Sequence, residues 1–424
     1  MKKLLFILLA IPLLFFSCEK ESGQLFDDSL SNPAYSADII ETVWSSKISF
    51  SEDDEGSIYQ VNMSDDLILS RSTNEIHVHS AETGEFLWSI PKNWDGSQLG
   101  QDAMVLGNQV YFYHNKFRDN AVWGINKQTG EIKNQIFLND FDEIKGSFVN
   151  HLFHGNSIYL LTYKPNKTFL DYDDFSFFIY KYNLVENELS LLFENTGVYR
   201  LSSQYLSDLV VNNEGTALYY PYLMKTGEEQ FEMEVVEILL DQKSAQIVVR
   251  DHFNADLRFN FIRGNTFTVS DDLLLINFYQ TVDSSLRVYD LSRDGEFLWK
   301  RNSSRIPQVH QGGLYLIVQH NTGSMQKIDL NTGIKLWDFP KSVVLDGFDF
   351  VGGKPLGVFV NRDRNSFSIL DLNSGNVLLE VFIEDLDIEQ LDNRFVRNIF
   401  SYKDGKHLIV TTRVGEILFL ELPF

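Results

Sequence analysis

The stretch Lys327-Ile328-Asp329-Leu330-Asn331-Thr332-Gly333-Ile334-Lys335-Leu336-Trp337 decides the fold predicted for this chain. It predicts a β-strand, a tight turn at Asn331-Thr332-Gly333 and a second strand that ends on a large aromatic residue. Glycine takes a positive φ angle at no steric cost, which is what a hairpin turn requires. The same phrase recurs along the chain, so the sequence indicates an array of copies of one unit.

Seven copies align on the Thr-Gly of this phrase, with the threonine-equivalent residue at positions 83, 129, 186, 244, 294, 332 and 374. A period of about 40 to 50 residues with strand-type units indicates a β-propeller. The first unit shows the order, with strands expected at 58–63, 66–70, 75–79 and 85–88. The wider spacings from the second to the fourth copy predict long loops at 163–176 and 224–230, where we expect binding specificity to lie.

The two ends of the chain complement each other. The chain stops after three strands of a last unit, expected at 395–400, 407–412 and 416–421, and the stretch 41–48 has no unit of its own. Pairing this stretch with the C-terminal strands would remove exposed sheet edges. The predicted fold is therefore all-β: an eight-bladed β-propeller over residues 40–424, closed by pairing an N-terminal strand with the C-terminal blade.

Composition supports strands and argues against some functions. Hydrophobic residues make up 44% of the 424-residue chain and aromatic residues 14%, with 34 Phe, 18 Tyr and 9 Pro, a bias that favours strands. The formal net charge of −23 repels nucleic acid, so we expect no nucleic-acid partner. The single cysteine, Cys18, excludes a disulfide within the chain and a zinc site built on several cysteines.

The N-terminus predicts a lipoprotein. Residues 1–17 have a basic start and an apolar middle too short to span a membrane, as in a signal peptide. Cys18 follows directly and resembles the acylated cysteine of a bacterial lipobox, which implies anchoring by several acyl chains, palmitate among them. A cleaved secretory signal with a chance cysteine is the alternative. Residues 18–39 are expected to be the lipidated cysteine and a flexible tether.

The phrase Asp-x-Asn-Thr-Gly-x-x-x-Trp from Asp329 to Trp337 resembles the repeat of the quinoprotein-like (PQQ-like) eight-bladed propellers. Trp88, Trp299 and Trp337 match the tryptophan of that repeat, and Trp44 matches it in the blade shared by the two ends. The resemblance implies that these four residues dock neighbouring blades. Other copies are degenerate and place Asn134, Leu191, Val249 and Leu379 at this position.

No candidate site supports catalysis. Enzymes of the resembled family typically carry adjacent cysteines beside their cofactor, which this chain lacks, so we expect no cofactor, metal or catalytic residue. His77 and His79 alternate on a predicted strand and could approach a metal, but an exposed strand face is the favoured interpretation. His151 and His154 offer no stronger pattern. The acidic stretches 52–55 and 171–174 are interpreted as solvated turns.

The predicted function is that of a non-enzymatic, protein-binding scaffold. The chain is expected in the cell envelope, anchored to the outer membrane by its lipid and bound to other envelope proteins. It resembles the propeller lipoproteins of the outer-membrane β-barrel assembly machinery. One alternative is a cell-surface lipoprotein that binds a glycan or another ligand, and another is a quinoprotein-like enzyme.

Overall fold

The computed structural model describes residues 40–50, 58, 60–64, 66–91, 93–94, 97–115, 120–166, 175–198, 209–212, 214–225, 230–242, 244–254, 266–270, 272–278, 285–302, 308–310, 313–318, 324–339, 344–361, 365–383, 386 and 396–423. The expected signal peptide, Cys18 and tether lie outside these ranges, as do the acidic stretches 52–55 and 171–174. Within the ranges, no helix has the length and hydropathy that a membrane crossing needs.

The repeated turn is organised by the acidic or amide side chain that begins it. Asp329 Oδ1 accepts from the backbone N–H of Thr332 at 2.8 Å and from its hydroxyl at 2.7 Å. The hydrogen bond from the Thr332 hydroxyl has the largest effect on the Asp329 carboxylate. Together with the bond from the Thr332 N–H, it holds the pKa of Asp329 below its ordinary value. Gly333 has a φ of +70° and donates its N–H to the Asp329 carbonyl. The same side-chain capping occurs in other copies, at Asn126, Asn183, Asp290 and Asp371.

The strands of the described residues form eight separate antiparallel sheets, most of them four-stranded. In the first half of the chain the sheets consist of β2 (Gln60–Ser64), β3 (Leu67–Arg71), β4 (Glu75–Ser80) and β5 (Phe86–Pro91); of β6 (Asn93–Trp94), β7 (Ser97–Leu106), β8 (Gln109–Asn115), β9 (Asn120–Asn126) and β10 (Ile132–Phe137); of β11 (Ser147–His154), β12 (Ser157–Pro165), β13 (Phe175–Asn183) and β14 (Glu188–Val198); and of β15 (Val210–Val211), β16 (Ala217–Lys225), β17 (Gln230–Leu239) and β18 (Ser244–Asn254).

The second half repeats the pattern and ends on a sheet that takes one strand from the N-terminal region. Its sheets consist of β19 (Thr266–Ser270), β20 (Leu273–Phe278), β21 (Ser285–Asp290) and β22 (Glu296–Asn302); of β23 (Gln308–His310), β24 (Gly313–Val318), β25 (Ser324–Asp329) and β26 (Lys335–Phe339); of β27 (Val344–Phe350), β28 (Leu356–Asn361), β29 (Ser366–Asp371) and β30 (Val377–Phe382); and of β31 (Val396–Ser401), β32 (His407–Thr412), β33 (Glu416–Glu421) and β1 (Glu41–Lys47). In the described part of the chain, the short 3-10 helix η3 (Leu138–Asp140) follows β10 and η4 (Leu291–Arg293) follows β21.

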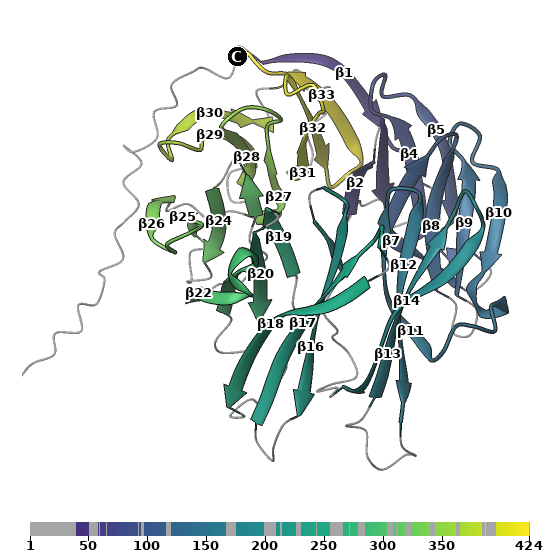
Figure 1. Ribbon diagram of the computed structural model, residues 1–424. Helices are drawn as coiled ribbons and strands as arrows, with labels where there is room; N and C mark the ends of the chain where they lie inside the picture. Colours follow the sequence, from purple (N-terminus) through teal and green to yellow (C-terminus); the bar gives the residue numbers. More distant parts are fainter. Residues whose placement is uncertain are drawn as a thin grey trace, which may run out of the picture.

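The sheets are arranged around a common centre, with β2, β19, β27 and β31 near it (Figure 1). Inner strands of neighbouring sheets touch, for example β2 with β7 and β31 with both β27 and β2. Buried apolar clusters fill the interfaces between neighbouring sheets, so the core is divided among these interfaces. One cluster joins β28 and β29 to β32 and β33 through Val358, Ile369, Val410 and Leu418.

β1 belongs to the same sheet as the last strands of the chain. It pairs antiparallel with β33, with Glu41 opposite Glu421 and Trp44 opposite Phe419. The rings of Trp44 and Phe419 stack at 5.2 Å between centroids with an interplanar angle of 4°. The strand expected from sequence at 41–48 therefore completes the last sheet and occupies the edge that β33 would otherwise expose.

A β-bulge recurs in the outer strand of every one of these sheets. The register skips one residue in each case: Val43, Leu87, Lys133, Leu192, Val248, Leu298, Leu336 and Leu378. A bulge bends a strand and re-aims the side chains beside it. In most sheets the residue after the bulge holds the tryptophan position of the sequence repeat, so the bulge is a structural part of the repeated unit.

Two expectations about the repeats need correction. The bounds expected for the loops at 163–176 and 224–230 were too wide, because β12 runs to Pro165, β13 starts at Phe175, β16 runs to Lys225 and β17 starts at Gln230. Residues 167–174 and 226–229 between these strands lie outside the described residues. Alternating apolar residues with partners on the neighbouring sheet let these strands continue. In addition, the second sheet has a fifth strand, β6, where four strands were expected.

Removal of β1 tests the pairing at the two ends. A variant without residues 1–47 loses β1 and the packed indole of Trp44, so we expect its free energy of unfolding to fall by about 2 kcal/mol or more. A matched variant without residues 1–39 keeps β1 and should be as stable as the full chain. Chemical denaturation of both variants measures the difference, and equal stability would contradict this role of β1.

Candidate functional site

Each of the four tryptophans expected at the repeat position lies against the turn glycine of the next sheet. A Cβ placed on the glycine would lie within 3.0 Å of an indole atom in every case, which leaves room only for glycine. The pairs are Trp44 with Gly84, Trp88 with Gly130, Trp299 with Gly333 and Trp337 with Gly375. We propose that these contacts dock neighbouring sheets.

Three of these indoles also hydrogen-bond to the turn that they cover. Trp88 Nε1 donates to the Lys127 carbonyl at 2.8 Å, Trp299 Nε1 to the Leu330 carbonyl at 2.8 Å, and Trp337 Nε1 to the Leu372 carbonyl at 3.1 Å. In all three the acceptor lies three residues before the glycine, so one geometry is repeated. Trp44 Nε1 is buried without a hydrogen-bond partner among the described residues.

The degenerate copies use other side chains. Val249 is buried and lies next to Gly295 of the following sheet, so it occupies the place of an indole. Leu191 is 44% exposed, and Phe193 follows the bulge of its strand instead and packs on Phe177 at 5.5 Å between ring centroids. The repeat spacing in the sequence placed Leu191 at the tryptophan position. The bulge in β14 lies two residues farther from the turn than in the other copies, so Phe193 takes that position instead.

The expectation that His77 and His79 lie on an exposed strand face was wrong. Both are buried, at 1% and 0% exposure, because β4 is a middle strand covered on both faces. His77 Nε2 lies 3.5 Å from Glu75 Oε2. Burial, with a smaller contribution from His77, lowers the pKa of His79 from its ordinary value of 6.5 to about 4. His79 is therefore a neutral core residue at physiological pH.

His151 and His154, the other two histidines considered from the sequence, make separate contacts. The ring of His151 stacks on Tyr113 at 4.1 Å between centroids. His154 lies against the turn glycine Gly215 of the following sheet, where a Cβ would lie 2.6 Å from its Nε2. Among the residues placed by the structure, no three His, Cys, Asp or Glu side chains are grouped as metal ligands would be.

A cavity of about 460 Å³ opens where inner strands of four sheets meet. Met63, Phe112 and Phe400 form part of its apolar wall, and the buried Arg71 and the partly buried Asp349 contribute charge. Asp349 Oδ2 accepts from the Ser401 N–H at 2.7 Å, which links β27 to β31. We therefore interpret these groups as part of the contact between inner strands.

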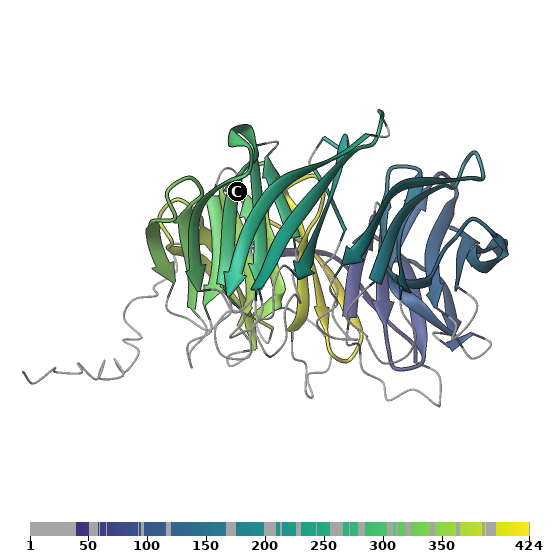
Figure 2. The same cartoon turned by 60° about the horizontal axis from the view of Figure 1, so that its bottom comes forward.

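The sheets β11–β14 and β15–β18 extend beyond their neighbours, and we name them the projecting sheets (Figures 1 and 2). The space between them is filled by buried aromatic side chains. Phe177 packs on Tyr220 and Tyr222, with ring centroids 5.2 Å and 5.0 Å apart, and the hydroxyls of Tyr163 and Tyr220 hydrogen-bond to each other. This aromatic core holds the two projecting sheets in one arrangement.

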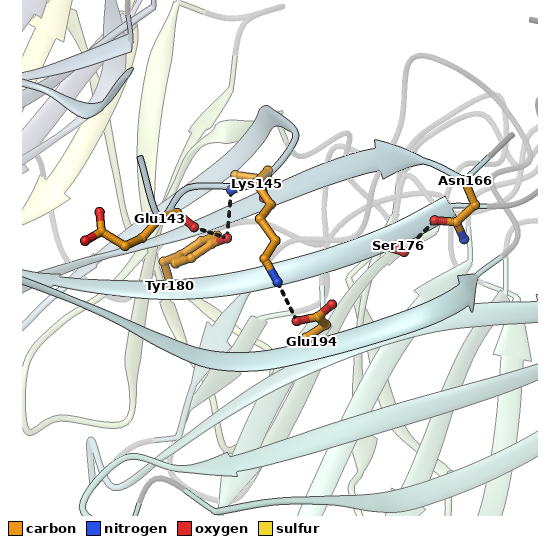
Figure 3. Close-up of polar contacts among 7 residues, drawn as sticks. Glu143, Lys145, Asn166, Ser176, Tyr180 and Glu194 are labelled. Carbon is orange, nitrogen blue, oxygen red and sulfur yellow. Dashed lines mark hydrogen bonds and ion pairs between the residues drawn. The ribbon is translucent and has the colours of Figure 1, made fainter. Parts of the chain in front are cut away.

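The segment before β11 is fastened to the first projecting sheet (Figure 3). Tyr180 donates its hydroxyl to the Glu143 carbonyl at 3.1 Å and accepts from the Lys145 N–H at 2.8 Å. Burial raises the pKa of this hydroxyl. Thr162 donates to the Lys145 carbonyl at 2.5 Å, and Lys145 Nζ forms an ion pair with Glu194 Oε2 at 3.0 Å.

Polar contacts continue along the extended parts of both projecting sheets. Ser176 Oγ donates to Asn166 Oδ1 at 2.6 Å, between the ends of β12 and β13 (Figure 3). On the second sheet, Tyr222 donates to Glu234 Oε2 at 2.6 Å and Arg250 Nε donates to Glu234 Oε1 at 3.0 Å. Burial and the Glu234 carboxylate raise the pKa of Tyr222. These contacts hold charged and polar side chains in defined positions on the surface of the projecting sheets.

Comparison with known proteins shows the fold. No protein family matches the sequence, and no curated protein matches it. The crystal structure of BamB from Moraxella catarrhalis is similar, with a TM-score of 0.53 and 12% identity over 90% of this chain and 100% of that chain. The C-terminal WD40 domain of Sif2 gives a TM-score of 0.54 and 10% identity, with 91% and 99% covered. The chain is thus a β-propeller similar to BamB, a propeller lipoprotein of the outer-membrane assembly machinery.

Two glycine variants isolate the docking contact. Gly107 and Gly130 have φ angles of +61° and +70°, but a Cβ would meet nothing within 4 Å at Gly107 and the Trp88 ring at 2.8 Å at Gly130. Gly107→Ala should cost about 1–2 kcal/mol of unfolding free energy from backbone strain. Gly130→Ala should cost a further 1–3 kcal/mol, roughly, because the indole is displaced.

Urea denaturation of the two variants gives this difference directly. The interpretation of the tryptophans as docking residues would be wrong if both variants lost the same free energy.

Proposed function

We propose that this chain is an envelope lipoprotein whose propeller acts as a non-enzymatic scaffold and binds other envelope proteins during the assembly of outer-membrane proteins. The observation that carries the proposal is the likeness to BamB, which covers 90% of this chain and the whole of BamB. The signal peptide expected at 1–17 and the acylated Cys18 support a place at the outer membrane. The sequences of this chain and BamB are 12% identical, so the likeness supports the fold, and the role in assembly is what we propose.

The proposal includes a complete propeller of eight blades. Eight sheets are present among the described residues, and β1 pairs with β33 at the junction of the two ends. A closed ring has no exposed inner edge and forms a rigid platform. Such a platform suits a scaffold, because the surface that binds partners is then held by fixed strands.

The projecting sheets are the surface that we assign to partners. They carry the residues inserted between the second and fourth repeats, and their aromatic core and ion pairs hold them in a defined arrangement. Arg250 is 61% exposed and lies beside the carboxylates of Glu232 and Glu234. An exposed surface with mixed charge on rigid strands fits a protein partner with complementary charges.

The exposed aromatic side chains favour this proposal over glycan binding. Among the described residues, three phenylalanines are largely exposed: Phe86 (51%), Phe137 (43%) and Phe297 (44%). They lie on β5, β10 and β22, and Figure 1 shows β22 on the opposite side of the molecule from β5 and β10. A glycan site would gather several aromatic faces on one surface. Here the three rings lie on three different sheets, and Phe86 and Phe297 share one repeated position, two residues before the tryptophan.

Crosslinking in the envelope tests the proposed function. The chain with a C-terminal tag, crosslinked in place and captured from membranes, should recover components of the outer-membrane barrel-assembly machinery. Deletion of residues 167–174, between β12 and β13, and of residues 226–229, between β16 and β17, should reduce this recovery at least about tenfold, since partner contacts concentrate on few residues.

The control is Val185→Ser. Val185 is 66% exposed and lies in the turn that joins β13 to β14, at the other end of β13 from its connection to β12. Recovery should be unchanged in this variant. Capture that is independent of the two hairpins would contradict the assigned surface. Recovery of surface transport proteins or glycan in place of assembly components would contradict the proposed function.

A further inference from the structure

The first sheet (β2–β5) and the last sheet (β31–β33 with β1) pack against each other, and we name this interface the terminal seam. Ile68 of β3 contributes to its buried apolar cluster from the first sheet, and Ile409 and Phe419 contribute from the last. Trp44 and Phe50 pack at its border. The terminal seam therefore joins the N-terminal part of the propeller to its C-terminal part.

Two histidines of β4 face the terminal seam. Ile76 and Val78 pack in the cluster shared with the second sheet, and because side chains alternate along a strand, His77 and His79 point the opposite way. The ring of His77 meets Phe50 edge-on, with centroids 5.8 Å apart. His79 is 0% exposed, so any charge on its ring would be carried inside the seam.

Buried polar atoms without a hydrogen-bond partner in the described part of the chain gather in this seam. They are Nε1 of Trp44, Oγ of Ser70, both ring nitrogens of His79 and Oγ1 of Thr411. Ser70 lies two residues from Ile68, and Thr411 two residues from Ile409, so both share a strand face with residues of the seam. A buried polar group that lacks a partner weakens the interface that contains it.

The first sheet supplies one carboxylate near the histidines. Glu75 Oε2 lies 3.5 Å from Nε2 of His77 and its side chain is 22% exposed. Beside His79, the cross-strand neighbours are Ile68 on β3 and Phe86 on β5, which carry no charge. The nearest titratable group acting on His79 is His77, whose positive charge would oppose protonation of His79.

The last sheet supplies no carboxylate to His79 either. Its titratable groups there include Tyr402, which packs in the apolar cluster, and His407, whose ring stacks on Phe419 at 4.6 Å between centroids. Lys403 is also there, and its charge acts on Asp66 of the first sheet. Glu416 of β33 is buried but alternates with the seam residue Ile417, so it points to the other face of the sheet. His407 Nδ1 is paired with Asp404 Oδ2 at 2.5 Å, so that carboxylate is already engaged. A protonated His79 would therefore stand without a counter-charge among the described residues.

We propose that the terminal seam is an acid-sensitive latch: protonation of His79 separates the first sheet from the last and releases β1, while the other interfaces stay packed. The released strand directly follows the tether expected at 18–39. Acidification would thus change how the propeller is held at its anchored end.

Opening at this seam leaves most of the core intact. The first sheet remains packed on the second through Leu69, Val78 and Phe112, and the last sheet remains packed on β27–β30 through Val358, Ile369 and Val410. β1 is mostly exposed, with Trp44 only partly covered. The opening is therefore local, as is common for elements with few buried contacts.

The sign of the pH dependence follows from the lowered pKa of His79. Because its folded pKa is about 4 and its ordinary value is 6.5, the opened state binds the proton more strongly. The stability that neutral His79 contributes is complete above pH 6.5 and is lost as the pH falls toward 4. Between pH 7 and pH 5 the opening equilibrium should rise about 20-fold.

Hydrogen–deuterium exchange of the full chain tests the latch. After correction for intrinsic exchange rates, protection of amides in β1 and β33 should fall about 20-fold from pH 7 to pH 5, and protection in β28 and β29 should not change. In His79→Leu, which keeps the seam apolar and removes the titration, the fall should be less than about twofold. His79→Gln provides a second non-titrating variant if the leucine disturbs packing.

His252→Gln is the matched control, since His252 is exposed on β18, and it should keep the wild-type pH dependence. Three results would overturn the proposal. They are protection in β1 and β33 that is equal at both pH values, an equal fall in the non-titrating variants, and loss of protection in β28 and β29 at the same pH.

Discussion

The packing of an outer-strand side chain against the turn glycine of the next sheet is the interaction on which this structure depends. The sheet hydrogen bonds run within each sheet, so something else must hold one sheet to the next. We propose that the indoles of Trp88, Trp299 and Trp337 fill this role, since each has a face against a turn glycine and an Nε1–H directed at a carbonyl of the same turn. The turn sequence and the bulge before the tryptophan are two parts of one contact.

Among the described residues, the contact between the last sheet and the first lacks the indole hydrogen bond that Trp88, Trp299 and Trp337 make. Trp44 lies on Gly84 and stacks on Phe419, but its Nε1 has no acceptor in the described residues. The buried His79 and Thr411 lie in the same interface. A propeller assembled from sequential sheets thus has one junction that differs chemically from the rest, and that junction holds the strand nearest the expected membrane anchor.

The sequence was informative where a residue pattern has one physical meaning. The Asp-x-x-Thr-Gly phrase predicted the turns, and the unmatched strand around Trp44 predicted the partner of β33, because both follow from local chemistry and edge pairing. The burial of His77 and His79 was missed, although the strand at 75–79 was expected as the third of its unit, because alternation along one strand does not show that neighbouring sheets cover both of its faces. The lengthened strands from Tyr163 to Pro165 were missed because an insertion can extend a hairpin as easily as a loop.

β1 and β33 lie side by side in one sheet, and we propose that this pairing closes the propeller. Glu41 and Glu421 are paired across β1 and β33, so cysteines at both positions, with Cys18 replaced by serine, lie close enough for a disulfide. Mild oxidation should give a monomer with an internal disulfide, detected by non-reducing mass spectrometry, while Glu41→Cys with Glu131→Cys stays reduced. Disulfides only between molecules, or none at all, would contradict the claim.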